Sequence, residues 1–263
     1  MKLTKKHIIF AIILLISVFS IYLNDPLNIN TSKRDLLIEE QLKQLKENTS
    51  VWFNGKEVKY YVGNNREYEW YIDQMNTGVH SNNNCGPSVV VMTLKWLDND
   101  IEETVEEARE MYYPQGQWWS MSTVKSYLSF HNVNYGYVFF ENESRSDKEE
   151  NIEKLKSEIE DNSIVILCVN MGYIPREYSE RLRTNRFYDY ANGHFIIVKG
   201  FVVIDNREYF EVYDPNNLYM TYEDSSPKGK DRYYDATSLS QSATNWCLYG
   251  LVIKEKGNKN FTD

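Results

Sequence analysis

Cysteine is scarce in this sequence, and basic residues do not cluster beyond the first few positions. Three cysteines among 263 residues, with no Cys/His spacing typical of a zinc site, argue against a structural metal centre. The formal net charge is −9, and the one arginine-rich stretch, 181–186, lies among acidic residues, so nucleic acid is not an expected partner. The first cysteine is Cys85, so no lipobox cysteine follows the N-terminal apolar run, which excludes a lipoprotein.

Large aromatic residues, by contrast, are abundant. The 21 tyrosines and 6 tryptophans fit a compact domain that contains β-strands. Without an N-terminal segment and a tether, roughly 210 residues remain, enough for one domain with a sizeable core. No internal repeat is visible.

The N-terminus has the layout of a membrane or secretion segment. Lys2, Lys5 and Lys6 precede an apolar run over 8–23. This run fits either an uncleaved anchor or a cleaved signal, and both alternatives stay open. In both cases the charges stay inside and the rest of the chain goes out, so we expect a protein anchored in the cell membrane with its domain outside, or a secreted one. Residues 1–23 are expected to form this anchor or signal segment, residues 24–50 a tether, and residues 51–263 the domain.

The order of the predicted elements indicates an α+β fold. Asn54-Gly55 is a hairpin signal, and Pro87 suits the first turn of a buried helix that follows Cys85. Helices come first in the domain and an antiparallel sheet follows, which predicts two lobes with a cleft between them. The patterns predict helices over 89–97, 101–112, 124–131 and 147–160, and strands over 135–140, 164–169, 194–204, 209–213 and 246–254.

Three residues in this order can build a thiol nucleophile. Cys85 opens the buried helix, whose N-terminus favours thiolate over thiol. His194 opens an apolar strand and can take the proton, and Asp214 ends the next strand and can orient the imidazole. His80 is a rival base, but it lies in a loop, which positions a catalytic group less well than a strand. Cys168 and Cys247 are either reduced core cysteines or a disulfide pair, which the sequence does not decide.

At these positions the sequence resembles a known family. Gln74, Asn84-Cys85-Gly86-Pro87, the strand 193–198 and Tyr213-Asp214-Pro215-Asn216 are similar to the bacterial papain-like cysteine peptidases related to the double-glycine leader peptidases. The resemblance covers about residues 65–255. It implies a papain-like two-lobed fold for the domain over 51–263, Cys85 as nucleophile, His194 as general base and acid, and Asp214 as the orienting residue. It also implies a peptide or protein substrate and no metal or organic cofactor.

The oxyanion donor departs from the family pattern. The family usually has a glutamine about six residues ahead of the cysteine, where this sequence has Val79. Gln74 lies further ahead and can return its amide through a longer loop. Asn82, Asn83 and Asn84 are alternative amide donors, and the backbone N–H of Cys85 should contribute in each case.

The resemblance implies a hydrolase that cleaves peptide bonds through a Cys–His–Asp triad. Two other classes stay open: an acyltransferase or transpeptidase with the same triad, and a non-catalytic extracellular binding module on the same fold. The sequence does not indicate which peptide is cleaved.

Overall fold

The computed structural model of the protein describes residues 26–141 and 145–255. The expected anchor or signal segment over 8–23 lies outside these residues and stays a prediction. Across the described ranges, no helix is both long enough and apolar enough to cross a membrane.

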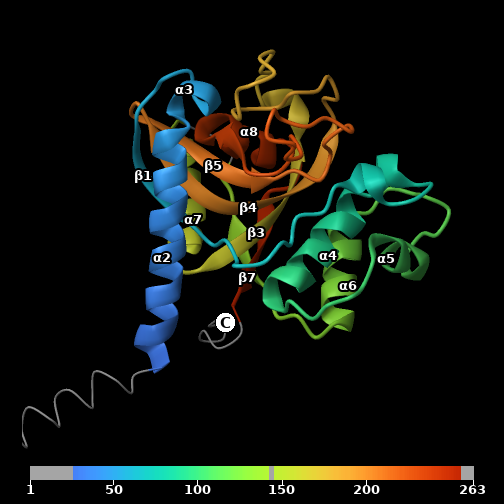
Figure 1. Cartoon of the computed structure of the whole chain (residues 1–263). Coiled ribbons are helices and arrows are strands. Elements are labelled where there is room, and N and C mark those ends of the chain that lie inside the picture. The colour runs from blue at the N-terminus through green and yellow to red at the C-terminus, as the bar shows by residue number, and fades with distance from the viewer. Residues whose placement is uncertain (1–25, 142–144, 256–263) are drawn as a thin grey trace, which may run out of the picture.

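A seven-stranded antiparallel sheet forms the centre of the domain (Figure 1). Six strands follow the order β2-β7-β3-β4-β5-β6, and β1 pairs with β4. The strands are β1 (Val58–Gly63), β2 (Gly136–Phe139), β3 (Ser163–Asn170), β4 (Gly193–Ile204), β5 (Arg207–Tyr213), β6 (Arg232–Asp235) and β7 (Tyr249–Lys254). Because β3 and β4 are buried on both faces, they read in the sequence as nearly continuous apolar runs.

Strand β4 connects most of the sheet. Its first half pairs with β3, with His194 opposite Val169, and its second half pairs with β1. Its other edge pairs with β5 through a tight turn at Asp205-Asn206, where both residues have positive φ (46° and 66°). Such left-handed pairs match the twist of a two-residue hairpin.

One face of the sheet carries the predicted helical lobe, made of α4 (Cys85–Leu97), α5 (Val105–Met111) and α6 (Met121–Phe130) (Figure 1). Helix α4 is apolar nearly all round, and Val89 to Met92 are all fully buried. It packs in one core with strand residues such as Ile166 and Ile197. The α+β class with a buried helix after Cys85 is therefore confirmed.

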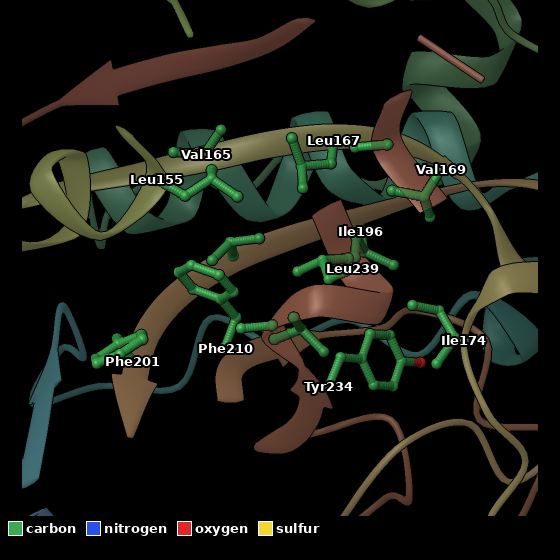
Figure 2. Packing of buried hydrophobic residues seen from close by; sticks show 14 of the residues in the cluster. Leu155, Val165, Leu167, Val169, Ile174, Ile196, Phe201, Phe210, Tyr234 and Leu239 are labelled. Atoms are coloured by element: carbon green, nitrogen blue, oxygen red, sulfur yellow. The ribbon is translucent and has the colours of Figure 1, made fainter. Parts of the chain in front are cut away.

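Helices α7 (Arg145–Glu160) and α8 (Ala236–Thr244) belong to a second core that includes the opposite side of strands β3 and β4. Figure 2 shows this core, in which Leu155 and Leu239 lie with side chains of β3, β4 and β5. Since neighbouring residues of β3 alternate between the two cores, the sheet is covered on both sides.

Helix α2 (Pro26–Glu47) occupies most of the stretch that we expect to be a tether. Its Leu45 is fully buried beside Val58 and Tyr61 of β1. The short helix α3 (Thr49–Trp52) follows, and Phe53 joins the same cluster. The boundary between tether and domain stays a prediction.

Two predicted details are wrong. Asn54-Gly55 does form a left-handed turn (φ 56° and 78°), but it links α3 to β1, and β1 pairs with β4. The turn signal is local and does not specify which strand is the partner. The last strand begins at Tyr249, after the predicted start, because the chain is still closing α8 where the N–H of Cys247 donates to the carbonyl of Ala243 (2.9 Å).

Candidate active site

Cys85 is the first residue of helix α4 and is half-buried. Asn84 precedes the helix, and its carbonyl accepts the N–H of Ser88 (2.9 Å), which starts the helical ladder. Pro87 lies in the first turn, where a missing N–H costs nothing. The sulfur therefore sits at the N-terminus of a 13-residue helix, whose partial positive charge favours an anion.

His194, only 3% exposed, joins the thiol to a carboxylate. Its Nε2 lies 2.7 Å from Oδ1 of Asp214. The imidazole also lowers the pKa of the Cys85 thiol. Since Nε2 faces Asp214, Nδ1 is the ring nitrogen that remains for the thiol. The structure thus brings together the three residues predicted from the sequence, from α4, β4 and the end of β5.

The carboxylate of Asp214 is fully buried and saturated with donors. Besides His194, Oδ1 accepts the N–H of Asn216 (2.9 Å), while Oδ2 accepts the hydroxyls of Tyr188 (2.6 Å) and Tyr234. Burial raises the pKa of Asp214, but the charge of His194 and these hydrogen bonds lower it by more than burial raises it. The pKa of Asp214 therefore lies below the ordinary value. Asp214 is therefore ionised at neutral pH. The two tyrosines were not foreseen.

The opposing effects of burial and of neighbouring charges also set the pKa values of His194 and Cys85. Burial lowers the pKa of His194, but Asp214 and the thiol overcome it and raise the pKa to about 10. Burial also raises the pKa of Cys85, yet the hydrogen bond and charge of His194 bring it below the ordinary thiol value. The backbone groups of Phe195 and Gly86 add to this lowering. The arrangement favours a thiolate–imidazolium pair near neutral pH.

Gln74 reaches the site in spite of its distance in sequence. It starts the short helix η1 (Gln74–Asn76), and its backbone N–H donates to the carbonyl of Pro215 (2.8 Å), directly after Asp214. Its side chain, 3% exposed, donates through Nε2 to the carbonyl of Ser81 (3.0 Å). An amide nitrogen has two hydrogens, so one remains for another acceptor.

The three asparagines differ in availability. Asn84 is buried and its Nδ2 donates to Thr77 (2.9 Å), so its amide is engaged away from the thiol. The amide of Asn83 donates to the carbonyl of Gly116 (2.9 Å). Asn82 is exposed. Asn82 and Asn83 still line the cavity described next, as does Gln74, whereas Asn84 does not.

A cavity of about 370 Å³ opens beside Cys85 and His194. None of its described lining residues is Asp, Glu, Lys or Arg, and five are aromatic. Trp118 from the helical lobe and Tyr190 from the sheet lobe meet edge to face, with ring centroids 6.5 Å apart. The lining comprises Gln74, Asn82, Asn83, Cys85, Trp118, Trp119, Cys168, Tyr190, Gly193, His194, Phe195, Asn216, Leu218 and Trp246.

The remaining candidates lie elsewhere or differ chemically. His80 lies against Gly116 and does not line the cavity. Cys168 lines it, but burial raises the pKa of its thiol well above the ordinary value. Cys168 and Cys247 are both free thiols, so they do not form the disulfide that was left open. Within the described part of the chain, no group of three or more His, Cys, Asp or Glu side chains is placed to hold a metal ion.

A helical lobe that presents a cysteine to a histidine on an antiparallel sheet is the architecture of the papain-like cysteine peptidases. Within that class, this chain belongs to the Peptidase_C39 like family, whose model matches residues 57–248. The resemblance seen in the sequence is thereby confirmed.

Among solved structures, the chain is similar to a C39-like peptidase candidate from Bacillus anthracis, at 11% sequence identity and a TM-score of 0.47. That match covers 75% of this chain and 99% of the other. A comparison of the sequence with curated proteins finds no match.

Proposed function

We propose that the protein is a cysteine peptidase that hydrolyses peptide bonds through Cys85, His194 and Asp214. The observation that carries this proposal is that Cys85 and His194 line one cavity, and that Nε2 of His194 lies 2.7 Å from the buried carboxylate of Asp214. Membership of the Peptidase_C39 like family supports peptides or proteins as substrates.

The reaction begins with attack of the Cys85 thiolate on the peptide carbonyl carbon. The resulting oxyanion accepts hydrogen bonds from the backbone N–H of Cys85 and from the second N–H of Gln74 Nε2. The imidazolium of His194 then gives its proton to the leaving amine as the C–N bond breaks, which leaves a thioester. His194 next takes a proton from water, the water attacks the thioester, and the acid product leaves as the thiolate re-forms.

The reactivity of the thiols tests this proposal before any substrate is known. We expect Cys85 to react with iodoacetamide well below pH 8, because its pKa lies below the ordinary thiol value. Cys168 serves as an internal comparison in the same cavity, since burial raises its pKa, and it should stay unmodified. Mass spectrometry reads both sites in one sample. Reaction of Cys85 only above about pH 8 contradicts the proposal.

Turnover is then measured with a peptide library and the Cys85→Ala variant. Hydrolysed products that disappear in the variant support a peptidase. Products joined to an added amine identify an acyltransferase. A biological effect that survives Cys85→Ala identifies a binding module.

We also propose that the segment over 8–23 takes the domain across the cytoplasmic membrane, as an anchor or as a cleaved signal. The lysines that precede the apolar run support this orientation. Protease added to intact cells should digest the domain, or the domain should be found in the medium. Complete protection of a cell-associated domain contradicts the proposal.

A further inference from the structure

Arg109 of helix α5 is a buried cation without an acidic partner. It is only 2% exposed. Within the described residues 26–141 and 145–255, the hydrogen-bond acceptors of its guanidinium are all neutral oxygens, and no carboxylate is among them. Because moving a charge out of water is costly, buried arginines are normally paired with acids. An unpaired one calls for a different stabilising partner.

The guanidinium is bound by neutral oxygens of two loops. Nε donates to Oδ1 of Asn84 (2.9 Å), and Nη2 donates to the carbonyl of Asn83 (2.6 Å). On the other side, Nη1 donates to the carbonyl of Gln117 (2.6 Å) and contacts that of Tyr113 (3.4 Å). One loop leads directly into Cys85, and the other leads into Trp118 and Trp119 of the cavity wall. Arg109 therefore fastens the segment before the thiol to the wall of the cavity.

Further hydrogen bonds connect Asn84 to Gln74, the proposed oxyanion donor. Nδ2 of Asn84 donates to the carbonyl and the hydroxyl of Thr77 (both 2.9 Å), and that hydroxyl donates to the carbonyl of Gln74 (2.5 Å). This chain of buried hydrogen bonds runs from Arg109 to the turn that carries Gln74. It accounts for how a long loop can return the glutamine to a fixed place beside Cys85.

The packing around Trp119 also places Arg109 near Cys85. The guanidinium carbon lies 5.8 Å from the ring centroid of Trp119, and a Cβ on Gly86 would come within 2.7 Å of Trp119. Arg109 is thus close behind the first turn of α4. Burial lowers the pKa of Arg109, and the negative charge of the Cys85 thiolate opposes this lowering. By reciprocity, the guanidinium favours the thiolate.

We infer that Arg109 is a positioning residue of the thiol site, which fixes the loops of Cys85 and Gln74 and whose unpaired positive charge stabilises the Cys85 thiolate. The inference rests on the proposed function. Three titratable groups line the cavity together with Cys85, namely His194, Cys168 and Tyr190, while Arg109 binds the loop that leads into Cys85. Cys168 and Tyr190 are neutral at pH 7, since burial raises pKa values that already lie above 7, so Arg109 is the second cation beside the thiol after His194.

Two substitutions separate charge from geometry. Arg109→Met removes both, and the midpoint pH for alkylation of Cys85 should rise by about one unit, a tenfold loss of thiolate below the midpoint. Arg109→Lys keeps the charge but loses the planar fork, so the midpoint should stay near that of the wild type while kcat falls about tenfold with KM nearly unchanged. The measurements are alkylation against pH by mass spectrometry, steady-state kinetics and Tm.

Arg66 provides the matched control. Its guanidinium stacks on Trp96 (3.9 Å) and donates to the carbonyl of Trp96 (2.9 Å), at the opposite end of the same helix α4. That end lies about 18 Å from the thiol at a rise of about 1.5 Å per residue, too far for a direct effect. Arg66→Met should lower Tm but leave the alkylation midpoint and kcat unchanged.

A lowered Tm in Arg109→Met with an unchanged midpoint and an unchanged kcat overturns the inference and leaves Arg109 a purely structural residue. If Arg109→Met does not fold, Arg109→Lys decides: wild-type kcat overturns the positioning role, and a reduced kcat that Arg66→Met does not share supports it. Failure of the proposed function is seen separately, as wild-type turnover that persists in Cys85→Ala. The alkylation midpoints require no turnover, so they still test the effect of Arg109 on the thiol.

Discussion

Replacing Asp214 by asparagine removes the charge that faces His194 but keeps an oxygen available. Oδ1 accepts both His194 Nε2 and the N–H of Asn216, whereas Oδ2 accepts the hydroxyls of Tyr188 and Tyr234. A backbone N–H cannot accept a hydrogen bond, so the new amide oxygen should take the place of Oδ1. The amide nitrogen then faces two hydroxyls, which can rotate to accept. The orientation and tautomer of His194 are therefore retained.

The loss of charge should appear in the pH dependence. The pKa of His194 should fall from about 10 towards the ordinary 6.5, because Asp214 provides most of the rise that overcomes burial. At about 1.4 kcal/mol per pH unit, this corresponds to about 5 kcal/mol less stabilisation of the imidazolium. At neutral pH a smaller fraction of the enzyme is then in the thiolate–imidazolium form, and we expect kcat/KM to fall roughly 10- to 100-fold.

Asp214→Ala is the matched comparison, because it removes the oxygen as well as the charge. His194, Asn216 and both tyrosines lose their acceptor, and kcat/KM should fall by roughly 10³–10⁴. The assay is the pH profile of kcat/KM for the wild type and both variants, with Tm as a check of folding. An alkaline limb that stays near pH 10 in Asp214→Asn refutes the electrostatic argument. Equal losses in the two variants refute the argument from orientation.

Three further results are expected. Gln74→Ala should lower kcat by roughly 10²–10³ with KM nearly unchanged, whereas Asn82→Ala should have little effect; kinetics that show the reverse would make Asn82 the oxyanion donor. Cys85→Ala and His194→Ala should each abolish turnover, and the double variant should cost little more, as measured by kcat; additive losses would mean that the two side chains act independently. In the wild type, kcat/KM should rise as Cys85 ionises below the ordinary thiol pKa and fall as His194 loses its proton near pH 10; a decline centred near pH 6.5 would contradict the charge of Asp214 as its cause.

The placement of the proposed nucleophile and its two proposed partners could be predicted because their signals are local. Cys85 precedes an unbroken apolar helix, and His194 and Asp214 lie at the ends of strands whose apolar runs are visible in the sequence. The turn at Asp205-Asn206 then requires those two strands to be neighbours. Local pattern and tertiary structure agree here, so the fold class and the three contacts follow.

The parts that escaped prediction depend on contacts between distant segments. Gln74 is a candidate from the sequence, but the contacts that hold it, with the carbonyls of Pro215 and Ser81, cannot be seen in the sequence spacing. Tyr234, which supports Asp214, is one of 21 tyrosines and lies on the short strand β6. Helix α8 is rich in serine and threonine, which are weak helix formers, so its sequence shows no clear helical signal. Its helical form depends on tertiary packing of Leu239 and Ala243 in the core.

The hairpin of β4 and β5 has a consequence for how the site is assembled. His194 and Asp214 are contributed by its two open ends, on one continuous piece of sheet, whereas Cys85 arrives on a helix of the other lobe. A displacement of one lobe relative to the other therefore changes the distance from sulfur to imidazole and leaves the imidazole–carboxylate distance as it is. The imidazole–carboxylate pair is thus held within one hairpin, whereas its distance from the sulfur depends on how α4 packs against the sheet.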